Sequence, residues 1–85
     1  MDVAEALGAN LKRLRAERDE SQESLGAKSD LHRTVISQIE AGKSDARAST
    51  LLKLSGALDV DPGELFRGMR WQPSTTTPGR YELSD

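Results

Sequence analysis

SQESLGAKSDLHRTVISQIE, residues 21–40, is the stretch that decides the fold. Ser21 is typical of a helix N-cap, so we expect a first short helix that opens there and runs to about Lys28. The polar pair Ser29-Asp30 predicts a break, because Asp tolerates the left-handed backbone of a tight turn. A second helix is expected over His32–Glu40, with Gly42 beyond it as the residue that stops the helix. The stretch therefore predicts two short helices joined by one turn.

The second of these helices has two chemically different faces. At about 100° per residue, Ile36 and Ile39 lie within roughly 60° of each other and form the apolar side. The opposite side carries a guanidinium, two hydroxyls and an amide, groups that hydrogen-bond to the edges of DNA bases. This layout is typical of a helix-turn-helix, which places its second helix in the major groove. An ordinary amphipathic surface helix is the alternative interpretation. The predicted base-contacting residues are Arg33, Thr34, Ser37 and Gln38.

Length and composition limit the chain to one small domain. A chain of 85 residues buries only about 60% of its unfolded surface, so its core is small. Because Phe66, Trp71 and Tyr81 are the only aromatic residues, that core must be mostly Leu, Ile and Val. The absence of cysteine and the single histidine, His32, argue against a metal site, and we expect no cofactor. The sequence shows no nucleophile paired with a base, so an enzyme is not expected.

The net charge and the first residues bear on partners and location. The formal net charge is -2, from 12 Lys and Arg and 14 Asp and Glu, which argues mildly against a nucleic-acid partner. It supports an alternative of another class, a protein-interaction module whose second helix docks a protein instead of DNA. The segment MDVAEALGAN lacks a basic start and a long apolar run, and no stretch approaches the roughly 20 apolar residues that span a bilayer. We therefore expect no signal peptide, no membrane association and a cytoplasmic location.

The flanking segments predict further helices and a tail. Leucines spaced three and four residues apart predict helices over about residues 3–18 and 49–58. A strong start signal, Asp-Pro-Gly-Glu, predicts a short fifth helix within residues 61–67. The expected fold class is all-α, a compact five-helix domain of residues 1–68, followed by a tail of residues 69–85. In that tail, the alternating residues around the loop PSTTTPG are equally compatible with a two-stranded ribbon and with a disordered segment.

Three segments resemble the phage repressor and Cro superfamily, also called the XRE family, of DNA-binding proteins. The second helix of that family usually opens Ser-Gln-x-x-Leu-Ala, where this chain has SQESLG at residues 21–26. The recognition helix usually ends Ile-Ser-x-Ile-Glu-x-Gly-Lys, where this chain has ISQIEAGK at residues 36–43. The later helices usually read Leu-Leu-x-Leu-Ala-x-x-Leu-x-Val, where this chain has LLKLSGALDV at residues 51–60. The resemblance covers about residues 7–67 and implies a lambda-repressor-like fold.

The resemblance also implies roles for residues outside the base-reading face. Arg15 and Glu40 match a pair that usually forms a partly buried salt bridge between the first helix and the end of the third. We expect this pair to be structural and to hold the recognition helix in place. Positions at the start of the second and third helices, and in the loop after the third, usually lie against DNA phosphates. In this chain those positions are Gln22, His32, Lys43 and Arg47.

The resemblance implies a sequence-specific transcriptional regulator. One recognition helix gives too little specificity, whereas two-fold pairing puts two helices about 34 Å apart, one turn of DNA, on a palindromic operator. We therefore expect a homodimer that binds double-stranded DNA as a repressor or other regulator. The alternatives are an antitoxin, with a toxin as partner, and a restriction-modification controller, to which the run LHRTVIS is similar. Apolar side chains after residue 64 are costly to expose, so they are expected at the dimer interface. The expected interface residues are Leu65, Phe66, Met69 and Trp71.

Overall fold

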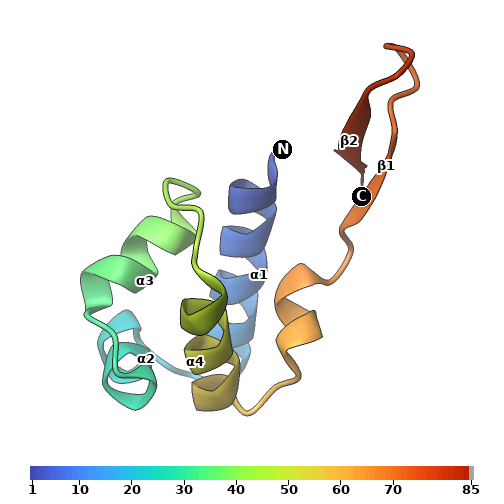
Figure 1. Ribbon diagram of the computed structural model, residues 1–85. Coiled ribbons are helices and arrows are strands. Elements are labelled where there is room, and N and C mark those ends of the chain that lie inside the picture. The colour runs from blue at the N-terminus through green and yellow to red at the C-terminus, as the bar shows by residue number, and fades with distance from the viewer. Residues whose placement is uncertain (85) are drawn as a thin grey trace.

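The computed structural model describes residues 1–84 and contains four α-helices, one 3-10 helix and a two-stranded antiparallel ribbon (Figure 1). The predicted helix-turn-helix is confirmed, and so is the ribbon over the alternative of a disordered tail. None of the helices in this part of the chain is long and apolar enough to cross a membrane. The elements are α1 (Val3–Glu17), α2 (Gln22–Ser29), α3 (Arg33–Glu40), α4 (Ala48–Leu58), η1 (Pro62–Phe66), β1 (Arg70–Pro73) and β2 (Tyr81–Ser84).

The core is aliphatic, as the composition predicts, and every helix contributes to it. The two isoleucines on the apolar side of α3 are both buried, which confirms the two-faced interpretation of that helix. Because α3 buries this side, its polar side must face outward. The core residues are Leu7, Leu11, Leu14, Leu25, Ile36, Ile39, Leu54, Leu58 and Leu65.

The backbones of α1 and of the end of α3 are in close contact, and Gly8 of α1 makes this close approach possible because it has no side chain. A Cβ atom at Gly8 would lie 2.2 Å from the carbonyl oxygen of Ile39 and 3.0 Å from that of Glu40. Real Cβ atoms do not approach an oxygen that closely, so no other residue fits without moving one helix. The contact therefore fixes the recognition helix against the longest helix of the molecule.

Three helices end at aspartates rather than at glycines. Asp19, Asp30 and Asp59 follow α1, α2 and α4 with φ angles of 52°, 58° and 55°. This is the left-handed region, which costs most residues about 1–2 kcal/mol, although Asp visits it more readily than others. The structure thus confirms the left-handed turn expected at Asp30, and this turn reverses the chain between α2 and α3.

The expected fifth helix is corrected to a 3-10 helix of five residues. The start signal works as predicted, because the Asp61 side chain accepts a hydrogen bond from the Gly63 amide at 2.9 Å. However, the segment is too short to propagate an α-helix, since nucleation is unfavourable and short runs favour the tighter i to i+3 pattern. Asn10 of α1 holds the end of η1, because its Nδ2 atom donates to the carbonyl oxygens of Leu65 (2.9 Å) and Arg67 (3.0 Å).

The ribbon projects from the helical body, beside the first turn of α1 (Figure 1). Trp71 pairs with Leu83 and Pro73 pairs with Tyr81 across the antiparallel strands. Because side chains alternate along a strand, these four residues share one face of the ribbon. Their aromatic rings are largely exposed, so the ribbon adds almost nothing to the core.

Candidate nucleic-acid interface

The polar face of α3 is accessible along its length. Arg33, Thr34 and Gln38 are exposed and Ser37 is half-buried, so the structure brings the four predicted base-contacting residues to one side of a helix at the edge of the body (Figure 1). The guanidinium of Arg33 lies 4.0 Å from the carboxylate of Glu23 on α2, and both side chains are exposed. An exposed pair of this kind is worth less than about 1 kcal/mol, so Arg33 is free to take another partner.

His32 is the N-cap of α3 and shapes the start of the recognition helix. Its Nδ1 atom accepts a hydrogen bond from the Thr34 amide at 3.1 Å and lies 2.7 Å from the Thr34 hydroxyl oxygen. An amide can only donate, so Nδ1 carries no hydrogen in this arrangement, and the hydrogen bonds assign the proton to Nε2. The Thr34 hydroxyl can share this acceptor by donating to Nδ1, and its oxygen then keeps its lone pairs for another donor. His32 thus presents a donor, and Thr34 an acceptor, at the outer surface.

Arg15 and Glu40 form a two-pronged ion pair that ties α1 to the end of α3. The Nε and Nη2 atoms of Arg15 lie 2.7 and 2.9 Å from the two Glu40 oxygens, and the Glu40 side chain is only 5% exposed. This hydrogen-bonded carboxylate raises the pKa of the Arg15 guanidinium above its ordinary value. The third nitrogen of Arg15 donates to the carbonyl oxygen of Glu20 at 2.8 Å, just before α2. One guanidinium therefore links the two helices of the motif to α1.

Gln22 takes part in the same network. The family resemblance implies a DNA phosphate contact for this residue, and the structure also gives it a protein partner, since its Nε2 atom donates to Glu40 at 3.2 Å. An amide nitrogen carries two hydrogens, so the second remains for another acceptor. Gln22 is the first residue of α2, behind the N-cap Ser21, whose hydroxyl accepts from the Ser24 amide at 2.9 Å. The capped start of α2 thus holds Gln22 at the edge of α3.

Lys43 and Arg47 lie in the exposed loop that joins α3 to α4. After α3 the amides of Gly42 and Lys43 donate to the carbonyl oxygens of Ile39 and Gln38, both at 3.0 Å, with Gly42 at a φ of 72°. This pair of hydrogen bonds is a Schellman motif, which fixes the direction in which the chain leaves the helix. The backbone of Lys43 is therefore fixed relative to the recognition helix. Arg47 is the N-cap of α4 and its side chain makes no capping bond.

The structure divides the four expected interface residues into two groups. Leu65 is completely buried in the core and Met69 packs against that core, so both side chains are already used within one copy of the chain. Leu65 is accordingly removed from the expected interface. Phe66 and Trp71 are exposed, by 43% and 68%, and remain accessible. Leu52 on α4 is also exposed, by 64%, and the sequence predicts no role for it.

The exposed groups of this surface suit the recognition of DNA. Within residues 1–84 no group of three His, Cys, Asp or Glu side chains could hold a metal ion. The exposed face of α3 instead offers a guanidinium, an amide and hydroxyl oxygens, with cationic side chains in the loop that follows. Guanidinium and amide groups suit base edges, and cations suit phosphates.

The helix-turn-helix family model matches residues 11–65, which include the whole of α2, α3 and α4. This chain belongs to the helix-turn-helix family. It is a DNA-binding transcriptional regulator of that family. Two curated relatives are similar to it over most of their own length. Control protein C.MunI of a Mycoplasma species is 44% identical over 66 residues, which cover 76% of this chain and 89% of the relative. The uncharacterized HTH-type transcriptional regulator y4dJ of Sinorhizobium fredii is 35% identical over 78 residues, 92% and 95% of the two chains.

A solved structure of a restriction-modification controller protein matches at the level of the backbone. The crystal structure of the restriction-modification controller protein C.AhdI of Aeromonas hydrophila superposes with a TM-score of 0.73 and 36% sequence identity. The match covers 74% of this chain and 96% of that protein. The fold expected from the resemblance to repressors is therefore confirmed for the helical part of the chain.

Proposed function

We propose that this helix-turn-helix protein binds a palindromic DNA operator as a homodimer, in the cytoplasm, and that α3 lies in the major groove. The observation that carries the proposal is the fixed polar face of α3. Gly8 holds the helix at backbone distance from α1, and the Arg15–Glu40 pair holds its end. A recognition helix binds DNA more tightly when its side chains are already oriented in the free protein, because ordering them on binding lowers the affinity.

Two sets of side chains divide the work on DNA. Arg33 and Gln38 suit guanine and adenine respectively, because a guanidinium and an amide can each form two hydrogen bonds to those bases. Thr34 and Ser37 complete the base-reading set. The phosphate-contacting set positions the protein without reading sequence, and it acts through charge or donated hydrogen bonds. This set consists of Gln22, His32, Lys43 and Arg47.

The His32–Thr34 hydrogen bond sets the polarity of one base contact. Because the Thr34 hydroxyl donates to His32 Nδ1 at 2.7 Å, its oxygen offers only lone pairs to DNA. In the major groove, adenine and cytosine present amino hydrogens that such an acceptor can use. Thr34 should therefore favour an adenine or cytosine at its position. In a selection from random sequences, Thr34→Val should lose that preference and Thr34→Ser should keep it.

A selection from random DNA sequences tests the proposal as a whole. The expected product is a palindrome with half-site centres one helical turn apart. Arg33→Ala and Gln38→Ala should each weaken binding to this site by about 1–3 kcal/mol and relax one position of it. Recovery of no enriched site would instead favour the protein-interaction module.

Salt dependence separates the phosphate contacts from the base contacts. Lys43→Ala should weaken binding to all sequences about equally and reduce the slope of log affinity against log salt by roughly one unit. Lys53, an exposed lysine on α4 outside the proposed interface, provides the matched control, and Lys53→Ala should leave the slope unchanged. A change of sequence preference at constant slope would contradict the phosphate role of Lys43.

A control protein of a restriction-modification system is the favoured subclass. Its support is the 44% identity to control protein C.MunI and the backbone match to the controller C.AhdI, both over most of their length. The antitoxin alternative has no such relative among these proteins. An expression reporter with the promoter of a neighbouring endonuclease or methyltransferase gene would test the subclass, since a controller must change its output.

We assign the dimer contact to the exposed surface around Phe66. Leu65 and Met69 pack within one copy and so act as support. Phe66→Glu should convert the dimer to a monomer in sedimentation at micromolar concentration, because it places a charge in an apolar contact. Truncation after Gly68 keeps Phe66 and removes Trp71. Equal dimerisation of the truncated and full chains would exclude the ribbon from the interface, and loss of the dimer would place Trp71 in it.

A further inference from the structure

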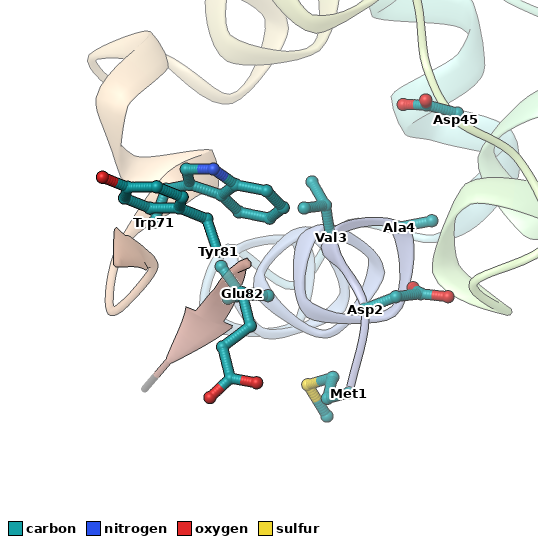
Figure 2. Close-up of a pocket in the computed structure, with 9 residues that line it drawn as sticks. Met1, Asp2, Val3, Ala4, Asp45, Trp71, Tyr81 and Glu82 are labelled. Atoms are coloured by element: carbon teal, nitrogen blue, oxygen red, sulfur yellow. The ribbon is translucent and has the colours of Figure 1, made fainter. Parts of the chain in front are cut away.

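A groove separates the ribbon from the first turn of α1, and all of its lining residues except Asp45 lie outside the residues that the family model matches. It has a volume of about 700 Å³ and is open to solvent on one side. Figure 2 shows Trp71 and Tyr81 together on the ribbon side, beside Val3 of α1. Val3 and Leu83 provide the apolar floor. The two aromatic side chains are 68% and 58% exposed, so a large apolar surface is left without a cover.

The charged side chains that line the groove are all acidic. Asp2, Asp45 and Glu82 line it, and none of the Lys or Arg side chains of residues 1–84 does. Asp2 and Asp45 lie across the groove from the aromatic rings in Figure 2. Such a rim repels DNA phosphates, so the groove is not an extension of the DNA interface. It attracts cations, and a lysine or arginine can also lie over the face of Trp71 or Tyr81.

We propose that this groove binds an extended peptide segment of a partner protein, in which lysine or arginine residues alternate with aliphatic ones. The basic side chains would meet the carboxylate rim and the aromatic faces, and the aliphatic ones would cover Val3 and Leu83. The outer edges of the ribbon have unpaired backbone groups, which can add a strand from a partner. The ribbon and the first turn of α1 lie apart from α3 (Figure 1), and Asp45 is the groove residue nearest in sequence to the proposed phosphate contacts.

The single tryptophan of the chain allows a direct test, because Trp71 lines the groove and is exposed. The probe is a capped peptide of alternating lysine and leucine without aromatic residues, and the matched control replaces each lysine with glutamate. The lysine peptide should shift Trp71 emission to shorter wavelength in a saturable way, and the shift should weaken as salt increases. The glutamate peptide should leave the emission unchanged.

Two variants test the charges without touching the fold. Asp45→Asn together with Glu82→Gln should weaken binding of the lysine peptide by roughly threefold or more, in line with two exposed charge pairs. Glu17→Gln, an exposed acid at the other end of α1, is the control and should leave the affinity unchanged. Asp2 is left intact, because its carboxylate caps α1 through the Glu5 amide.

Each other outcome overturns the proposal. Equal binding of both peptides would show an apolar surface without charge selection, and binding of neither would remove the peptide partner. An emission shift that follows protein concentration alone would assign the groove to a second copy of the chain. A shift caused by operator DNA would place the groove at the DNA interface.

Discussion

The two surfaces proposed for binding are held in opposite ways. Helix α3 is fixed by the Gly8 contact, an ion pair and two buried isoleucines. The packing of the core therefore determines where its outward side chains lie. The ribbon follows Met69, which packs against the core, and its two aromatic rings are largely exposed. An isolated two-stranded ribbon is at best marginally stable in water. The comparison shows that the surface proposed to bind the rigid DNA duplex is anchored to the core, whereas the ribbon has few such contacts and can adjust its shape to a partner.

The largest effect should come from Gly8. Gly8→Ala places a Cβ atom 2.2 Å from the Ile39 carbonyl oxygen, so α1 and α3 must separate. We expect a loss of at least about 3 kcal/mol in the free energy of unfolding by urea, together with loss of operator binding. Gly56, also in a helix, is the control, because nothing lies within 4 Å of its Cβ position. Gly56→Ala should stabilise by about 0.5–1 kcal/mol, and equal effects of the two changes would refute the close contact.

The ion pair should have the next largest effect. Glu40→Ala leaves the half-buried Arg15 guanidinium without its partner and frees the amide of Gln22. A fully buried pair costs about 3–5 kcal/mol to break, and since Arg15 is 17% exposed we expect roughly 2–3 kcal/mol. Glu17, which pairs with Arg13 at the surface, is the control, and Glu17→Ala should cost about 0.3–0.5 kcal/mol. Urea unfolding of the two variants measures both losses. Similar losses for the two variants would mean that the Glu40 pair is as weak as a surface pair.

The N-cap of α3 should have a smaller effect. His32→Ala removes the acceptor for the Thr34 amide and should cost about 1 kcal/mol, whereas His32→Asn supplies another acceptor and should cost much less. Thermal unfolding measures both. If both variants also lost the base preference assigned to Thr34, His32 would set the hydroxyl through its ring nitrogen; if only the alanine variant lost it, the helix start alone would matter.

The smallest effect should come from the ribbon. Trp71→Ala should change the free energy of unfolding by less than about 0.5 kcal/mol, because the ring is 68% exposed. Its melting temperature should therefore match that of the unchanged protein, in contrast to Gly8→Ala. A large loss in dilute protein would show that the ribbon supports the helical body and would end the comparison drawn above.

The sequence predicted the helix-turn-helix because its signals are local. A two-faced third helix, a serine cap and an aspartate turn each follow from neighbouring residues, and all three occur in the structure. The ribbon was left open between two alternatives, because four alternating residues on each side of a loop are too few to decide. The 3-10 form of η1 was missed, since the same start signal opens either kind of helix.

Other features could not be read from the chain because they depend on distant partners. Gly8 looks like any helical glycine until α3 lies against it, 31 residues further along. The Asn10 bonds to η1 join residues 55 and 57 positions apart. Family position suggested a phosphate for Gln22 but could not show that Glu40 also takes its amide. Local sequence patterns thus predict the helices, whereas the contacts between helices appear only once the helices are packed together.

The aspartates that end α1, α2 and α4 bear on how this protein could be made to tolerate heat. A carboxylate at the negative end of a helix is unfavourable, and a left-handed backbone adds to that cost. Asparagine removes the charge and accepts the same backbone. Asp19 and Asp59 lie outside both the core and the recognition helix, so they can be exchanged without altering either. Replacing these two aspartates by asparagine should therefore raise the free energy of unfolding in small steps without altering the surface proposed to bind DNA.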